Sequence, residues 1–165
     1  MSLVRSFPPI ATRSARLLIL GSMPGVRSLA AGQYYAHPHN SFWRILGEIL
    51  HFDAAAPYAE RTLALTRAGI ALWDVLQSCV RPGSLDSAIE RDSRVPNDFA
   101  AFFRGHPRIE RVCFNGGEAE RSFRRYVAPV LADDTREYRR LPSTSPAHAG
   151  LPFAAKLAAW REALE

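Results

Sequence analysis

Short apolar segments that alternate with predicted helices constrain the fold of this 165-residue chain more than any other feature. Apolar runs at 17–20, 70–73 and 109–114, and a weaker, more polar run at 137–141, are typical of strands. The predicted helices cover 42–52, 57–68, 96–103, 117–127 and 153–164. Such alternation predicts βαβ units, a parallel sheet and right-handed crossovers. We therefore expect an α/β fold built on a four-stranded parallel sheet.

The composition is that of one globular domain without a membrane segment. Hydrophobic residues make up 47% of the chain and charged residues 22%, so we interpret 1–165 as one domain in which 1–14 form an N-terminal arm. No apolar run approaches the roughly 20 residues that a spanning helix needs. The arm also lacks the apolar core of a signal peptide. We expect a cytoplasmic, monomeric protein that makes no contact with a membrane.

Residues that hold cofactors in other proteins are sparse. Cys79 and Cys113 are too few for a disulfide framework or for an Fe–S cluster held by four thiolates, and Cys113 lies in an apolar run as inert packing. His37, His39 and His148 suggest a metal site, but a proline separates the first two and no cysteine or carboxylate lies nearby. Neither a Gly-Lys-Ser/Thr phosphate loop nor a dinucleotide-binding glycine pattern is present. We therefore predict no metal and no cofactor.

The basic character of the chain favours an anionic partner. The formal net charge is +5, and a phosphate backbone is a typical partner of such a protein. Arginines gather at 121–125 and at 136–140. Contacts with DNA would explain both clusters, and a solvated face would explain them equally well.

Polar, glycine-rich or proline-rich residues follow each predicted strand. Residues 21–25 follow the first strand, Asp74 the second, Asn115-Gly-Gly the third and 142–148 the fourth. The carboxyl ends of parallel strands meet at one edge of a sheet, where open α/β sheets bind ligands. The segment 33–43 adds two tyrosines, two histidines and an asparagine before a helix. We therefore expect these segments to converge on one cleft.

Three of these segments resemble the uracil-DNA glycosylase superfamily, and within it most closely the hypoxanthine-DNA (deoxyinosine) glycosylases. The likeness lies in Gly21-Ser-Met-Pro-Gly25, Ala36-His-Pro-His-Asn-Ser-Phe-Trp43 and Leu141-Pro-Ser-Thr-Ser-Pro146. It covers nearly the whole chain from Leu17 onward, with the motifs in the same order. The resemblance implies a three-layer α/β/α sandwich whose partner is damaged DNA. Such an enzyme extrudes a deaminated base and hydrolyses its N-glycosidic bond, which leaves an abasic site.

The resemblance also implies roles for individual residues. Asn40 falls at the catalytic position, where its amide would position the attacking water. Tyr35 takes the place of the base-stacking aromatic residue, an interaction worth roughly 1–3 kcal/mol per base. Asp74 would accept from the N1–H group of hypoxanthine, a donor that adenine lacks. The base-binding set is Ser22, Met23, Tyr35 and Asp74, and the set that forms the motif loops and binds phosphate is Gly21, Pro24, Gly25, His39, Pro142, Ser143, Thr144, Ser145 and His148.

Three positions depart from the uracil-processing branches. Met23 stands where the mismatch-specific enzymes have the asparagine that positions water, and Asp74 stands where the common uracil glycosylases have the asparagine that reads uracil. Leu141 replaces the histidine that begins their last motif. The resemblance therefore favours release of hypoxanthine, with uracil released weakly or not at all. The alternatives are a mismatch-type uracil-DNA glycosylase and a non-catalytic DNA-binding α/β module; a small-molecule hydrolase would leave the basic clusters without a role.

The same residues also have purely structural interpretations. Asn40 can cap the helix that begins at Ser41, in addition to any catalytic role. Tyr35 suits a half-buried loop position, and Asp74 can cap the turn after its strand. Asn115 is better explained by an Asn-Gly turn than by a phosphate contact, and His148 by a position on the surface.

The chain has few amines that could attack a sugar, and this predicts a monofunctional enzyme. A combined glycosylase and lyase attacks the sugar with an amine and forms a Schiff base. The chain offers Lys156, its single lysine, and the N-terminal amine. We expect Lys156 to lie in the last helix, away from the strand ends, and the N-terminal arm to be flexible. Water is then the nucleophile.

Overall fold

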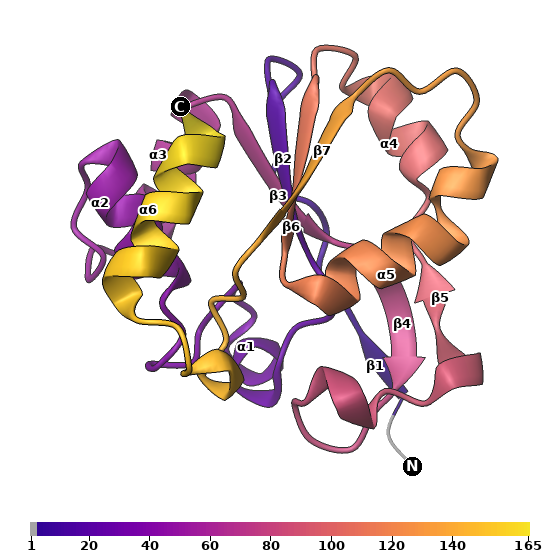
Figure 1. The fold of residues 1–165 in the computed structure, drawn as a ribbon, viewed down its shortest axis with the longest axis horizontal. Helices are drawn as coiled ribbons and strands as arrows, with labels where there is room; N and C mark the ends of the chain where they lie inside the picture. Colours follow the sequence, from indigo (N-terminus) through magenta and orange to yellow (C-terminus); the bar gives the residue numbers. More distant parts are fainter. Residues whose placement is uncertain (1–2) are drawn as a thin grey trace.

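The four strands expected from the sequence form a parallel sheet at the centre of the molecule (Figure 1). The computed structural model describes residues 3–165. The sheet has the order β3-β2-β6-β7 and consists of β2 (Leu17–Gly21), β3 (Ile70–Asp74), β6 (Arg111–Asn115) and β7 (Glu137–Leu141). The helices are α1 (Val26–Ala31), α2 (Phe42–Leu50), α3 (Tyr58–Arg67), α4 (Phe99–Gly105), α5 (Gly117–Tyr126) and α6 (Phe153–Leu164). Within residues 3–165, none of them has the length and apolar character needed to cross a membrane.

Each face of the sheet packs against its own set of helices. Alternate side chains of a strand point to opposite faces. Leu17 and Ile19 accordingly belong to the core completed by α2, α3 and α6, whereas Leu18 and Leu20 belong to the core completed by α4 and α5. Figure 1 shows these two sets of helices on opposite sides of the strands. The three-layer α/β/α sandwich is therefore confirmed.

The strand order places a crevice beyond the ends of β2 and β6. After β2 the chain moves to β3 at one edge of the sheet, whereas after β6 it moves to β7 at the other edge. Ligands of open α/β sheets bind where neighbouring strands diverge in this way. The registers Gly21↔Asp74 and Asn115↔Leu141 bring all four carboxyl ends to one edge. The segments that follow the strands converge there, as predicted.

A second, antiparallel sheet has no counterpart in the sequence pattern. It has the order β1-β4-β5 and consists of β1 (Leu3–Arg5), β4 (Leu76–Val80) and β5 (Val95–Pro96). The expectation of a flexible N-terminal arm is wrong for its described part, because β1 pairs with β4 and Ile10 forms a bridge with Leu72. Residues 1–2 of the arm, and with them the N-terminal amine, lie outside the described residues.

Helix boundaries differ from the predicted ones where capping residues decide them. Helix α4 begins at Phe99 rather than Pro96 because the Asp98 side chain accepts from the Ala101 N–H group at 3.0 Å. Helix α2 ends at Leu50 because His51 adopts a left-handed conformation with φ of 63°. The short helix α1 is not predicted. The loops contain the 3₁₀ helices η1 (Asp86–Ala88), η2 (Arg91–Ser93), η3 (Ala128–Val130) and η4 (Pro146–His148).

Candidate active site

The ends of β2 and β3 bring a buried carboxyl group close to a tyrosine hydroxyl group. Gly21 and Asp74 are paired at these ends, and Asp74 is only 3% exposed. A Cβ atom at Gly21 would lie 2.6 Å from Asp74 Oδ1 and 2.9 Å from the hydroxyl oxygen of Tyr35. Glycine is therefore required at the start of this turn to let both groups approach the strand end.

Asp74 and Tyr35 both present polar atoms that the protein leaves without a partner. Asp74 Oδ2 and the Tyr35 hydroxyl group are buried and make no hydrogen bond within residues 3–165. Burial raises the pKa of the Asp74 carboxyl group to about 7; the charge of Asp86 adds to this rise and Arg81 opposes it. Burial, and then the charge of Asp74, also raise the pKa of the Tyr35 hydroxyl group, which stays protonated. The pair thus offers an acceptor and a donor to a ligand beyond the strand ends.

Tyr35 is held in an uncommon backbone conformation. Its φ of 54° lies in the left-handed region, which residues other than glycine seldom adopt. The ring stacks on Phe42, a fully buried residue at the start of α2, with 4.1 Å between ring centroids and 20° between the planes. The half-buried loop position expected for Tyr35 is confirmed. Strain of this kind gathers at functional sites.

Asn40 caps α2 and lies beside the segment that follows β7. Its Oδ1 accepts from the Phe42 N–H group at 3.0 Å, which confirms the capping interpretation; α2 begins at Phe42, and Ser41 occupies the N-cap position between the two. The N–H group of Ser41 donates to the carbonyl oxygen of Thr144 at 3.0 Å. The cap uses one lone pair of the amide, and an amide has a second lone pair and two N–H donors besides. Asn40 is therefore compatible with capping and with a contact to water or substrate.

Asn115 connects the end of β6 to the same segment. Its Nδ2 donates to Thr144 Oγ1 at 2.9 Å, and its Oδ1 accepts from the Thr144 N–H group at 3.0 Å. Thr144 is 1% exposed, so this double contact is buried. The Asn-Gly turn favoured from the sequence is only part of the role of Asn115. The turn itself uses Gly116, with φ of 92°, while Asn115 fixes the position of Thr144.

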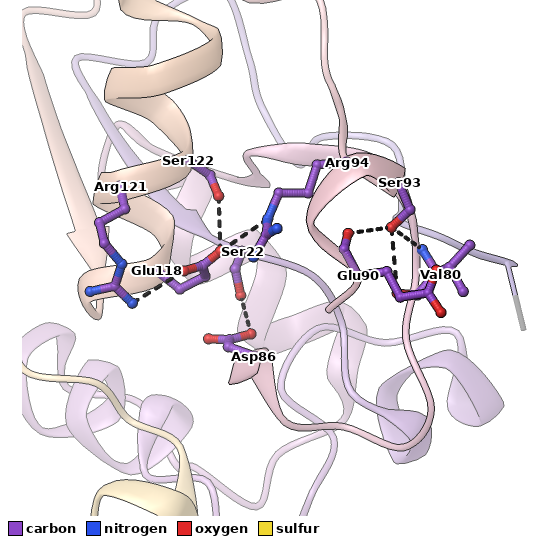
Figure 2. A network of polar contacts seen from close by, with 9 residues as sticks. All are labelled: Ser22, Val80, Asp86, Glu90, Ser93, Arg94, Glu118, Arg121 and Ser122. Carbon is purple, nitrogen blue, oxygen red and sulfur yellow. Dashed lines mark hydrogen bonds and ion pairs between the residues drawn. The ribbon is translucent and has the colours of Figure 1, made fainter. Parts of the chain in front are cut away.

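The side chains of Ser22 and Met23 have partners within the protein. Met23 is 7% exposed and belongs to the core that contains α4 and α5. Ser22 Oγ donates to the Asp86 carboxylate at 2.6 Å, a contact that connects the turn 21–25 to η1 (Figure 2). Gly25 precedes α1 and provides its N-cap. For Ser22 and Met23, contact with a base stays a prediction.

Arg81 is a site residue that the sequence pattern does not reveal. The residue is 1% exposed; its Nη2 donates to the carbonyl oxygen of Pro24 at 2.6 Å and its Nε to the carbonyl oxygen of Gly83 at 2.8 Å. Within residues 3–165, Nη1 is buried without a hydrogen-bond partner. Arg81 thus clamps the turn 21–25 to the loop after β4 and places a positive charge near Asp74. The only sequence signal was a lone arginine before the Pro-Gly-Ser loop.

Ion pairs hold the segment 81–94 against α5. Arg94 Nη2 lies 2.8 Å from Glu118 Oε1, and both side chains are largely buried. Ser122 donates to the same carboxylate, and Arg121 pairs with its second oxygen, as Figure 2 shows. The Ser22–Asp86 contact in the same view connects this network to the turn after β2. The segment is therefore anchored both to the turn after β2 and to α5.

The two histidines of the segment 33–43 hold a local turn. His37 Nδ1 accepts from the His39 N–H group at 3.0 Å, and the rings are 5.5 Å apart. His39 is exposed, and its predicted contact with phosphate stays a prediction. Within residues 3–165, no group of three or more histidine, cysteine or acidic side chains is placed to hold a metal ion.

The segment 142–151, named here the strap, runs from the end of β7 to α6. Trp160 Nε1 donates to the carbonyl oxygen of Pro142 at 2.9 Å. Ser143 Oγ accepts from the N–H group of Ser145, and Ser145 Oγ accepts from the N–H group of Ala147. Both serines therefore shape the strap. A contact of Ser143, Thr144 or Ser145 with a phosphate stays a prediction.

Lys156 lies against the strap, and the expectation that it lies away from the strand ends is wrong. Its Nζ donates to the carbonyl oxygen of His148 at 2.8 Å, and the residue is 6% exposed. It shares a pocket with Ser143 and His148. The helical pattern correctly places Leu157 on the face of α6 that packs against the core. It does not indicate that the long side chain of Lys156 reaches back to the sheet edge.

Comparison with known proteins assigns the chain to a family. The family model of the uracil DNA glycosylase superfamily matches residues 8–164, nearly the entire chain. The chain belongs to the uracil DNA glycosylase superfamily. The motifs that carried the resemblance therefore lie in a chain of that superfamily.

Two curated relatives, each named hypoxanthine DNA glycosylase, are similar to the chain. The one from Methanosarcina barkeri is 38% identical over 142 residues, which are 82% of this chain and 89% of the relative. The one from Methanosarcina acetivorans is 34% identical over 145 residues, which are 87% of each chain. The solution NMR structure of a provisionally named uracil DNA glycosylase from Methanosarcina acetivorans superposes with a TM-score of 0.80 at 30% identity. That likeness covers 99% of this chain and 100% of the other.

Proposed function

We propose that this superfamily member is a DNA glycosylase that removes hypoxanthine from DNA. The observation that carries the proposal is the buried Asp74 carboxyl group, whose Oδ2 has no partner within residues 3–165 and lies at the sheet edge where ligands bind. As a carboxylate it accepts from the N1–H group of hypoxanthine, whereas adenine has no proton at N1. The two curated relatives with this name support the proposal.

The remaining residues supply the steps of base release. The damaged nucleotide is extruded from the duplex, and its base stacks beside Tyr35, whose ring Phe42 holds in place. Asn40 directs a water molecule at C1′ as the bond to the base breaks and the sugar gains positive charge. The Asn40 amide does not need to accept a proton from this water. A sugar that resembles an oxocarbenium ion reacts readily with neutral water, so the water has only to be held in position. The strap holds the phosphate of the same nucleotide through Ser143, Thr144 and Ser145.

The reaction is that of a monofunctional enzyme. Water adds to C1′ and the base leaves with the electron pair of the N-glycosidic bond. The proton that the water loses neutralises the departing base, and the other product is an intact abasic site. No covalent intermediate with the protein forms. We further propose that the enzyme acts as a monomer in the cytoplasm, at the nucleoid, because one chain supplies all the residues named above and the substrate is DNA.

A panel of oligonucleotides tests the proposal. Each carries one hypoxanthine, uracil, xanthine or ethenoadenine, and released base is scored as an alkali-labile site. We expect cleavage of the hypoxanthine strand, with weaker or no cleavage of the uracil strand. Uracil is the competing substrate, because its N3–H group would also donate to Asp74. Robust release of uracil without hypoxanthine would contradict the proposal, and binding without release of any base would identify a non-catalytic module.

A further inference from the structure

Asp86 is a carboxylate at the mouth of the candidate active site, and none of the steps of base release described above uses it. It lies in η1, where its Oδ1 accepts from the hydroxyl group of Ser22 at 2.6 Å (Figure 2). Asp86 is exposed, whereas Asp74 at the end of β3 is only 3% exposed. Asp86 therefore lies nearer to solvent than the group proposed to read the base.

Two side-chain contacts hold η1 and the residues before it against the turn after β2. Ser22 donates to Asp86, and Ser84 Oγ accepts from the N–H group of Val26 at 2.8 Å. Figure 2 shows the second carboxylate oxygen of Asp86 directed away from Ser22, and within residues 3–165 this oxygen accepts no hydrogen bond. One oxygen of the carboxylate is thus anchored, and the other is open to a ligand.

Asp86 and Asp74 share a single nearby cation. Burial lowers the pKa of the Arg81 guanidinium, and the charges of Asp86 and Asp74 are among the effects that oppose this. Arg81 already donates to two carbonyl oxygens. Glu118, which is paired with arginines, and His148 of η4 also face Asp86. When both aspartates are ionised, they and Arg81 carry one net negative charge, which a cationic ligand would neutralise.

We propose that Asp86 is a catalytic residue, whose carboxylate contacts the sugar of the extruded nucleotide and stabilises its positive charge as the N-glycosidic bond breaks. The inference rests on the proposed function. A base that reaches the buried Asp74 places its sugar further out, beside the turn after β2, where Asp86 is held. That turn, Gly-Ser-Met-Pro-Gly, has no charged side chain of its own. A carboxylate fixed before the reaction stabilises the developing charge without rearrangement.

Two abasic analogues measure this interaction without relying on turnover. One labelled duplex carries a neutral tetrahydrofuran ring, and the other carries a pyrrolidine ring whose protonated nitrogen replaces the positive C1′ atom. Their Kd values are compared by anisotropy at about pH 8, where Asp74, with a pKa of about 7, is ionised. The wild type should bind the pyrrolidine duplex roughly 10²-fold more tightly, because it resembles the transition state. Contacts with the DNA backbone are common to both duplexes and cancel in the ratio.

Asp86→Asn removes the charge and keeps an acceptor for Ser22. The preference for the pyrrolidine duplex should fall by at least about tenfold. The single-turnover rate of hypoxanthine release should fall by about 10²-fold. Asp92→Asn is the matched control and should keep the preference, because Asp92 is exposed in η2 and its substitution changes the net charge equally. Asp74→Asn should lose less of the preference than Asp86→Asn, because both analogues lack the base that Asp74 faces.

Three results would overturn the inference: equal binding of the two duplexes by the wild type, an unchanged preference in Asp86→Asn, or an equal loss in Asp92→Asn. Should Asp86→Asn fail to fold in a thermal melt, Ser22→Ala tests the same contact. It frees the carboxylate from its anchor, so the preference should fall, and an unchanged preference overturns the inference.

The outcomes also separate this inference from the proposed function. Release of hypoxanthine by a wild type without preference for the cation contradicts the role of Asp86 and leaves the proposed function intact. A preference that depends on Asp86, in a wild type that releases uracil and not hypoxanthine, supports the role of Asp86 and contradicts the proposed substrate.

Discussion

At the scale of single residues, the buried carboxyl group of Asp74 combines a proposed role in base binding with a cost to stability. Its pKa is about 7 in the folded protein, chiefly because of burial, and about 4 for an exposed aspartate. Between these two pH values the folded protein holds a proton at this position that the unfolded chain has lost. The free energy of unfolding therefore falls as pH rises from about 4 to 7 and is little affected by this group above that range.

The first prediction concerns the pH dependence of this residue. Release of hypoxanthine should rise with pH through about 7, because the ionised carboxyl group is a stronger acceptor for N1–H than the protonated one. Asp74→Asn has an acceptor that does not titrate, so its profile of kcat/KM against pH should be flat in this range. The same variant should lose the fall in the free energy of unfolding between about pH 4 and 7, measured by denaturant titration. If the kcat/KM profile of Asp74→Asn kept a midpoint near pH 7, the prediction would be contradicted.

Asn40 has a structural contribution and a proposed catalytic one, and two substitutions separate them. Asn40→Ala should lower base release by at least about 10²-fold, the scale for loss of a positioned polar group, and stability by about 1 kcal/mol through loss of the cap on Phe42. Asn40→Ser keeps a capping oxygen, so stability should recover while base release stays low. Single-turnover rates and thermal melts measure the two effects. Near-native turnover in Asn40→Ser would show that Asn40 is only a cap.

At the scale of elements, the turn after β2 depends on partners from other segments. The carbonyl oxygen of Pro24 accepts from Arg81, and Ser22 donates to Asp86 of η1. The strap in turn is held by Asn115 at the end of β6 and by Trp160 of α6. The loops that face the substrate are thus fixed by buried polar contacts rather than by their own conformational preferences.

Arg81→Met tests the clamp between the turn and the loop after β4. The substitution leaves the carbonyl oxygens of Pro24 and Gly83 without their donor, so the free energy of unfolding should fall by roughly 2–4 kcal/mol. It also removes the cation that opposes the rise of the Asp74 pKa, so the midpoint of the pH profile should move above 7. Arg91→Met, at an exposed position in the same segment, is the control. An unchanged midpoint would show that the charge of Arg81 does not influence the pKa of Asp74.

At the scale of the whole molecule, the packing of α6 against the strap decides where the single lysine lies. Burial lowers the pKa of Lys156, which would make its amine a better nucleophile, and the residue lines a pocket beside the candidate site. Its ammonium group, however, already donates to the carbonyl oxygen of His148. We therefore expect water, and not Lys156, to react with the sugar.

Borohydride trapping checks this assignment. Incubation with deoxyinosine DNA and borohydride should give no covalent adduct, and cleavage of the strand should require added alkali or heat, because water and not an amine attacks the sugar. A duplex that already contains an abasic site serves as the control for reaction with the product. A trapped complex that is lost in Lys156→Ala would establish a lyase and contradict the monofunctional assignment.

The sequence by itself determined the elements whose signal is local. The apolar runs of β2, β3 and β6 and the apolar face of α6 are patterns within a few residues, so their place in the fold follows directly. The order of the segments after the strands likewise predicted one convergent site, because parallel strands end at one edge. Asn40 and Tyr35 could be selected for the same reason, together with the resemblance of their motif.

Only the tertiary structure decided the features that depend on partners distant in sequence. Strand β1 is three residues long and exists through its pairing with β4, so no local pattern predicts either the second sheet or the ordered arm. In the sequence, Arg81 and Lys156 resemble solvated charges. In the structure both are buried, and each donates to carbonyl oxygens that only the folded chain brings within reach. The pKa of Asp74 has the same origin, because burial and the charges of Asp86 and Arg81 act only once the strands and loops are packed together.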